Sequence, residues 1–279
     1  MPLIVSVSSL KGGVGKTSLT LGLASAGMDA GMKILVIDMD PHGDASTGLA
    51  VSPEGTDIGT MLASPRKYSL NKEVRPSGWN DLQASKSQQT KAKHSSPSQG
   101  KIDVARGSSA STALENLSLH RALPRLKKLI SGQIDDYDLV LIDCPPTLGR
   151  LTSMAWAVSD RVISVAEPSL FSVAGTERTL RAIARFEANS EYSVDSASIV
   201  INKVREGDPE HSYRIEEMRT MFGELVADPV LPDYPGFQRI QGSAYPVHYW
   251  PEDSSQEFAQ ALSDILSGLL GSTSSTEAA

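Results

Sequence analysis

The sequence contains very little cysteine, and this excludes several kinds of site. Cys144 is the only cysteine among the 279 residues. The chain therefore cannot form an internal disulfide or a four-thiolate metal centre. An iron–sulfur cluster held by several cysteines of one chain is excluded for the same reason. Low cysteine content is also typical of proteins kept in a reducing compartment.

The sequence also lacks the features of a membrane or secreted protein. The apolar run at residues 2–5 ends at Ser6 and has no basic residue before it, so it is too short for a signal peptide or a membrane span. No lysine or arginine follows Arg239, so the C-terminal region lacks the basic residues that attach a helix to a membrane surface. We therefore expect a cytoplasmic protein with no membrane partner.

The charge of the chain is unevenly distributed. The formal net charge is −7, which argues against a protein that coats nucleic acid over its whole surface. Nine basic residues between Arg66 and Arg106 face only three acidic ones, so this stretch is basic in an otherwise acidic chain. Within it, residues 84–100 are polar and almost without apolar side chains, which predicts a mobile basic insertion. A small, polar tail at 272–279 is expected to be disordered.

Short apolar runs alternate with longer helical patterns along residues 1–271. Continuous apolar runs are typical of strands that are buried on both faces of a sheet. The alternation predicts a single α/β domain with a doubly wound, mostly parallel sheet of seven or eight strands and helices on both faces. The strands are expected at residues 3–8, 33–37, 102–105, 139–142, 162–166, 198–201 and 229–231, and helices at 16–30, 118–131, 176–188 and 212–222.

A glycine-rich segment follows the first expected strand and precedes the first expected helix. Its glycines allow successive backbone N–H groups to point at phosphate oxygens, and the helix adds the positive end of its dipole. A lysine and a threonine follow, as phosphate binding and Mg²⁺ ligation require. The segment predicts a site for the phosphates of a nucleotide and for Mg²⁺. Its residues are Gly12, Gly13, Val14, Gly15, Lys16, Thr17 and Ser18, preceded by an additional lysine, Lys11.

Acidic residues follow two other expected strands, where ligands bind in parallel α/β sheets. Asp38 and Asp40 end the second strand, and a pair of aspartates before a proline is also ordinary turn chemistry. Asp143 ends an apolar strand in the arrangement that holds Mg²⁺ in phosphate-loop enzymes. The sequence therefore predicts that carboxylates gather beside the phosphate loop.

These motifs resemble those of the ParA/MinD family of ATPases. The loop KGGVGKTS is similar to the deviant Walker A motif of that family, and DMDPHGD and DCPP at 38–44 and 143–146 resemble its next two motifs. The resemblance implies that Lys11 crosses the interface of an ATP-dependent homodimer and touches the partner's nucleotide. It implies that Asp40 orients the attacking water and that Asp38 lies near the Mg²⁺ ligands Thr17 and Asp143. His42 and Asp44 depart from the glutamine and asparagine that are common in the family.

Asn202 follows another expected strand and offers a donor and an acceptor to the edge of an adenine ring. An asparagine after a strand is also a common turn former. The resemblance implies that Asn202 contacts the base, with backbone contacts near Pro232 and Asp233.

Several members of the family are distinguished by the C-terminal half. MinD-like proteins attach to membranes through a basic amphipathic helix, whereas the apolar stripe at 255–270 has acidic neighbours and is expected to pack on the sheet. Arg178, Arg181 and Arg185 share one helical stripe, which favours contact with DNA phosphates. The alternative is a solvated helix face whose arginines pair with Glu177 and Glu187. Arg205 and Arg239 are two further candidates for DNA contact.

The resemblance as a whole implies a ParA-like ATPase for plasmid or chromosome partitioning. Its ATP-bound dimer would bind double-stranded DNA without sequence preference, and a ParB-like partner would stimulate weak hydrolysis and release the dimer. Its location would then be cytoplasmic and associated with the nucleoid. We also expect residues 84–100 to add phosphate contacts as a basic arm. The alternatives are a MinD-like membrane-associated ATPase, an orphan cargo-positioning ATPase, and a metabolic ATP-dependent ligase or kinase on the same fold.

Overall fold

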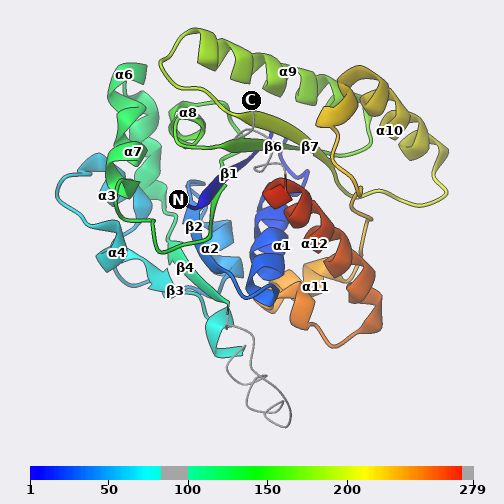
Figure 1. The fold of residues 1–279 in the computed structure, drawn as a ribbon, viewed down its shortest axis with the longest axis horizontal. Helices are drawn as coiled ribbons and strands as arrows, with labels where there is room; N and C mark the ends of the chain where they lie inside the picture. The colour runs from blue at the N-terminus through cyan, green and yellow to red at the C-terminus, as the bar shows by residue number, and fades with distance from the viewer. Residues whose placement is uncertain (83–99, 272–279) are drawn as a thin grey trace.

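A computed structural model describes residues 1–82 and 100–271 (Figure 1). The described residues contain one seven-stranded sheet in the order β3-β4-β2-β5-β1-β6-β7. Every pair of neighbouring strands is parallel except β3 and β4 at one edge. The strands are β1 (Leu3–Ser8), β2 (Lys33–Asp38), β3 (Arg75–Pro76), β4 (Lys101–Ala105), β5 (Leu139–Asp143), β6 (Arg161–Ala166) and β7 (Ser196–Ile201).

The strand order brings three carboxyl ends together. β5 lies between β1 and β2, so the ends of these strands are adjacent although the sequence separates them. Asp38 at the end of β2 is in register with Asp143 at the end of β5. The crevice beyond such strand ends, where the strand order reverses, is where ligands bind in open α/β sheets.

The expected strands differ from the observed ones in two ways. The antiparallel edge strand β3 was not predicted, because two residues that include Pro76 give no strand pattern. The strand expected at 229–231 was wrong: this segment runs beside β7, where Leu231 N–H donates to the Ile201 carbonyl and Val204 and Pro232 form an isolated bridge. The prediction of seven or eight mostly parallel strands is confirmed with seven.

Helices cover both faces of the sheet (Figure 1). Helices α1, α11 and α12 pack on one face, and α3, α7, α8, α9 and α10 pack on the other. Their bounds, with those of the remaining α-helices, are α1 Lys16–Asp29, α2 Asp44–Gly48, α3 Ile58–Ala63, α4 Leu70–Glu73, α6 Leu119–Ala122, α7 Pro124–Ile130, α8 Arg150–Trp156, α9 Leu170–Ala188, α10 Pro209–Phe222, α11 Phe237–Gly242 and α12 Gln256–Gly271. The 3-10 turns are Ser109–Asn116, Gly223–Leu225, Val247–Tyr249 and Asp253–Ser255.

Three expected helices have clearly different bounds; α10 begins at Pro209 rather than at residue 212. The helix expected at 118–131 is divided into α6 and α7, because Pro124 begins a new helix at a position where its missing N–H is not needed. The helix expected at 176–188 begins six residues earlier, at Leu170. The earlier start places the N-terminal end of α9 next to the phosphate loop, as the contacts below show.

The C-terminal helix α12 packs along α1. A Cβ on Gly22 would lie 2.7 Å from a methyl carbon of Leu262, so the absence of a side chain at this position permits the close approach. Phe258, Leu262, Ile265 and Leu269 are all buried there, which places the expected apolar stripe against the rest of the domain. Among the described residues, no helix is both long enough and apolar enough to cross a bilayer. The insertion expected at 84–100 and the tail at 272–279 lie outside the described residues, except for Gly100.

Candidate nucleotide-binding site

The loop between β1 and α1 has the backbone shape that its glycines predict. Gly13 and Gly15 have φ angles of 78° and 99°, in the left-handed region that favours glycine. Gly15 is also the N-cap of α1, and a Cβ there would lie 2.3 Å from the side-chain nitrogen of Asn202. The loop therefore opens onto the N-terminal end of a 14-residue helix, a favourable place for an anion.

The first turn of α1 is tied to the end of β5. Thr17 Oγ1 donates to Oδ2 of Asp143 at 2.7 Å, and Thr20 Oγ1 donates to Oδ1 at 3.0 Å. Lys16 has only 7% of its surface exposed, and its positive charge partly offsets the burial that raises the pKa of Asp143. The lysine, the threonine hydroxyl and the carboxylate therefore converge at one point beside the loop.

Asp38 and Asp143 form a buried pair of carboxyls on neighbouring strands. Burial and, to a smaller extent, the nearby charge of Asp38 together raise the pKa of Asp143 to about 7. Burial also raises the pKa of Asp38 to about 6, although hydrogen bonds from Ser46 work against this. Two buried like charges are unfavourable unless a cation neutralises them. The pair therefore favours binding of a positive ion.

Ser46 fixes the Asp38 carboxylate. Its backbone N–H and its hydroxyl both donate to Oδ2 of Asp38, at 2.8 and 2.6 Å. Gly107 packs against the same carboxylate so closely that a Cβ there would lie 2.7 Å from Asp38 Cγ. Asp40 lies two residues after Asp38 and is 8% exposed. Its Oδ1 accepts a hydrogen bond from the His42 N–H. Within the described part of the chain, its Oδ2 accepts no hydrogen bond.

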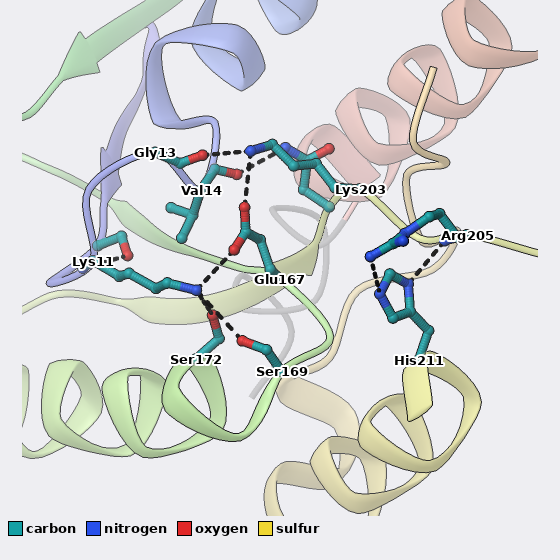
Figure 2. Close-up of polar contacts among 11 residues, drawn as sticks. Lys11, Gly13, Val14, Glu167, Ser169, Ser172, Lys203, Arg205 and His211 are labelled. Atoms are coloured by element: carbon teal, nitrogen blue, oxygen red, sulfur yellow. Dashed lines mark hydrogen bonds and ion pairs between the residues drawn. The ribbon is translucent and has the colours of Figure 1, made fainter. Parts of the chain in front are cut away.

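Glu167 holds two lysines at the rim of the loop (Figure 2). Lys11 Nζ donates to Glu167 Oε2 at 2.8 Å, and Lys203 Nζ donates to Oε1 at 2.8 Å and to the Gly13 carbonyl. Burial alone would raise the pKa of Glu167, but the hydrogen bonds and charges of the two lysines outweigh it and lower the pKa. Ser169 and Ser172, at the start of α9, lie 3.4 and 3.3 Å from Lys11 Nζ.

Among the residues expected near the base, Asn202 lies at the phosphate loop. Asn202 Nδ2 donates to the Val14 carbonyl at 2.9 Å, so its side chain lies against the phosphate loop (Figure 2). Pro232 and Asp233 are brought beside β7 by backbone pairing, because the Asp233 N–H donates to the Val204 carbonyl at 2.8 Å. Ser18 contacts the neighbouring helix α11, where the side-chain nitrogen of Gln241 donates to its hydroxyl at 3.1 Å.

Comparison with known proteins decides the family. A model of the AAA domain family matches residues 3–195. The chain is 26% identical over 244 residues to the chromosome-partitioning ATPase Soj of Treponema pallidum, covering 88% of this chain and 86% of Soj. The chain belongs to the ParA/MinD-type family of AAA-domain ATPases.

Two solved structures show the same fold at low sequence identity. The ATP complex of McdA from Cyanothece is 16% identical with a TM-score of 0.76, and the match covers 97% of this chain and 96% of McdA. Cobyrinic acid a,c-diamide synthase from Mycobacterium smegmatis, with bound ADP and magnesium, is 18% identical with a TM-score of 0.74, over 99% and 96% of the two chains. The family fold is thus shared by proteins with different names and roles.

The residues of this family member fit a nucleotide with its magnesium ion. Mg²⁺ binds through one or two protein oxygens together with phosphate oxygens and water, so it does not require a cage of carboxylates. The described residues contain no group of three or more histidines, cysteines or acids that could hold a metal. The hydroxyl of Thr17 and the carboxylates of Asp143 and Asp38 supply the small oxygen set that this mode of binding requires.

The arginines expected to contact DNA differ in their partners within the chain. Arg178, Arg181 and Arg185 are all exposed on α9, but Arg181 pairs with Glu177 at 2.5 Å, as the alternative interpretation expects for that residue. Arg205 lies 3.3 Å from a ring nitrogen of His211 (Figure 2). Arg239 on α11 is paired with Glu252 and lies over the ring of Trp250.

Three site residues were missed by the sequence analysis. Glu167 and Lys203 are far apart along the chain, and only the pairing of β6 with β7 brings them together. Lys203 has a φ angle of 59°, an unusual backbone conformation for a lysine that no sequence pattern indicates. No sequence pattern indicated Ser46, because it lies in α2 and only the fold brings it to the carboxylate of Asp38 in β2.

Proposed function

We propose that the chain is a ParA-like partition ATPase that binds ATP and Mg²⁺ and forms a homodimer over two nucleotides. The dimer binds double-stranded DNA without sequence preference, and a ParB-like partner stimulates hydrolysis and releases it. The match to Soj over most of both chains supports the partition role. The gathering of the phosphate loop and two buried aspartates at three neighbouring strand ends supports nucleotide binding.

The proposed roles of the residues follow from their positions. The backbone N–H groups of the loop and the ammonium of Lys16 bind the phosphates, and the oxygens of Thr17 and Asp143 hold the ion with Asp38 nearby. A bound Mg²⁺ would neutralise charge that develops on the phosphate oxygens. Asp40, partly shielded beside this group, accepts a hydrogen bond from the attacking water and orients it.

The position of Lys11 is the observation that carries the proposal of a dimer. Lys11 points along the rim toward Glu167 and α9 (Figure 2). Lys16, in contrast, is buried near Asp143. Two phosphate-binding lysines in one loop repel each other less when each serves a different nucleotide. Leu170 and Phe171 next to this rim are 54% and 76% exposed, which supports a contact with a second copy.

Membrane attachment by the C-terminal helix is disfavoured by the packing of α12. Its apolar residues are buried against α1 and the sheet, so attachment would require the helix to leave the domain. This favours a DNA surface over a lipid surface for the ATP-bound dimer. Sedimentation with anionic vesicles in the presence of ATP distinguishes the two, because a MinD-like protein would sediment and a ParA-like protein would not.

The test is an electrophoretic shift on random-sequence duplex DNA with ATP, with ADP and without nucleotide. We expect retardation only with ATP. Arg178→Gln together with Arg185→Gln should weaken the shift. Arg214→Gln together with Arg219→Gln, two arginines on α10 that already pair with carboxylates, serves as the control with the same change in charge. Retardation that is independent of nucleotide, or none in any condition, would refute the proposed function.

A further inference from the structure

A basic hollow lies on the surface between α3 and α7, separate from the nucleotide site. Its volume is about 320 Å³. Five of its nine lining residues are basic and none is acidic. In Figure 1 this region lies at the left of the molecule, whereas α9 runs along the top. The basic residues are Arg66, Lys67, Arg121, Arg125 and Lys128.

The hollow is held in shape by one of its arginines. Arg125 Nη1 donates to the carbonyls of Leu62 and Ala63, at 2.7 and 2.8 Å, and so caps the C-terminal end of α3. Its Nε donates to the Arg121 carbonyl at 3.0 Å. The turn that carries Arg66 and Lys67 is therefore fixed against α6 and α7. The basic side chains of the turn and those of the two helices line the same hollow.

The remaining basic side chains are available to a ligand. Arg66, Lys67, Arg121 and Lys128 are exposed, and no carboxylate among the described residues forms an ion pair with any of the five. Arg121, Arg125 and Lys128 are spaced by four and three residues, so they share one side of the α6–α7 pair. Like charges that are gathered without counterions favour an anion that spans several of them.

The lining indicates which polyanion fits. A protein or lipid partner would require exposed apolar anchors beside the charges. The large exposed hydrophobic side chains of the described residues are Met1, Leu170, Phe171, Tyr213, Met221 and Leu225, and none of them lines the hollow. Sequence-independent contact with nucleic acid depends instead on phosphates and needs neither apolar anchors nor base contacts.

We propose that the hollow between α3 and α7 is a second docking surface for the phosphate backbone of duplex DNA, distinct from the arginines of α9. This inference rests on the proposed function, because it assigns a further surface to the same partner. The chain then meets DNA at two places, with Arg66, Arg121 and Lys128 contacting phosphates directly. Arg125 keeps its structural role as the cap of α3.

The test compares two variants with the same change in charge. The first replaces Arg66, Arg121 and Lys128 with glutamine; the matched control replaces Lys33, Lys101 and Arg219, which do not line the hollow. Binding to a labelled random-sequence duplex is measured by fluorescence anisotropy with ATP and Mg²⁺ across a series of salt concentrations. Equal melting temperatures show that both variants are folded, and equal ATP-dependent dimerisation shows that both still respond to the nucleotide.

We expect the hollow variant to bind DNA about tenfold more weakly than the control and to have a shallower salt dependence, by about 0.9 in slope for each lost phosphate contact. Equal affinities and slopes in the two variants would overturn the inference. If the hollow variant lost binding to phosphatidylserine vesicles or to inorganic tripolyphosphate but bound DNA as the control does, the inference would be overturned as well. If the unaltered protein binds no duplex in any nucleotide state, the proposed function itself fails.

Discussion

Lys11 forms an ion pair with Glu167 of its own chain, with 2.8 Å between Nζ and Oε2. The same carboxylate binds Lys203, which also donates to a carbonyl of the phosphate loop. The lysine that is proposed to reach the partner's nucleotide is therefore neutralised within its own protomer. On the proposed mechanism, dimerisation with ATP would require Lys11 to exchange this carboxylate for phosphate.

Glu167→Gln is expected to favour the dimer. Because the ion pair is partly exposed, its loss is worth no more than about 1 kcal/mol, and the ATP concentration for half-maximal dimerisation should fall roughly two- to fivefold. Light scattering during an ATP titration measures this. Glu177→Gln removes an equal charge from the exposed pair with Arg181 and should leave the midpoint unchanged. A higher midpoint in Glu167→Gln would show that Glu167 positions Lys11 productively.

The two lysines of the phosphate loop should separate binding from assembly. Lys16→Ala removes the buried ammonium beside Asp143 and is expected to abolish binding of a fluorescent ATP analogue. Lys11→Ala leaves that ammonium in place, so the analogue should still bind the monomer while ATP-dependent dimerisation is lost. Equal loss of nucleotide binding in the two variants would contradict the separate roles.

The exposed ring of Phe171 is expected to lie in the dimer interface. Phe171→Ser should weaken ATP-dependent dimerisation by about tenfold or more, because a buried aromatic side chain dominates an interface where it is present. Met221→Ser on α10 is the matched control, since this side chain is also apolar and is 49% exposed. Sedimentation velocity at several protein concentrations measures both. Equal dissociation constants would place Phe171 outside the interface.

The pair of buried carboxyls predicts how stability depends on pH without metal. Burial raises the pKa of Asp38 to about 6 and that of Asp143 to about 7, above the value of about 4 in an unfolded chain. Between the unfolded pKa of about 4 and the folded pKa values of about 6 and 7, the folded protein binds more protons than the unfolded chain. Lowering the pH through this range therefore stabilises the fold. The melting temperature in EDTA should therefore rise as the pH falls from about 8 to about 6.

Asp38→Asn is the matched variant for this measurement. It removes one of the two like charges and with it part of the increase in the Asp143 pKa, so its melting temperature should depend less on pH. Saturating ATP and Mg²⁺ should also flatten the dependence in the unaltered protein. A melting temperature that falls with the pH across this range in the unaltered protein would contradict the arrangement.

Local patterns were sufficient to locate the residues that gather at the candidate nucleotide site. The phosphate loop, Asp38 and Asp143 each follow an apolar strand, so their chemistry could be assigned from a few neighbouring residues, and the parallel sheet then brings them together. The buried face of α12 was also predictable, because its apolar stripe has no basic residues beside it.

Contacts between distant segments could not be predicted in the same way. Glu167 meets Lys11 and Lys203 only because β6 lies between β1 and β7 and because α9 begins at Leu170. The hollow at Arg125 depends on the capping of α3 by a residue more than 60 positions away in the chain. The prediction for 229–231 failed for the opposite reason: the segment has strand-like residues, but isolated bridges form only at Val226 and Pro232 on either side of it.

The most direct test of the central claim is the molecular mass of Asp40→Ala in solution. This variant keeps the phosphate loop and the pair of buried aspartates but removes the residue that is proposed to orient the water. Multi-angle light scattering with saturating ATP and Mg²⁺ should give the mass of two chains, and the same sample with ADP should give the mass of one. A single-chain mass with ATP and Mg²⁺ would contradict the proposal that two copies enclose the nucleotides.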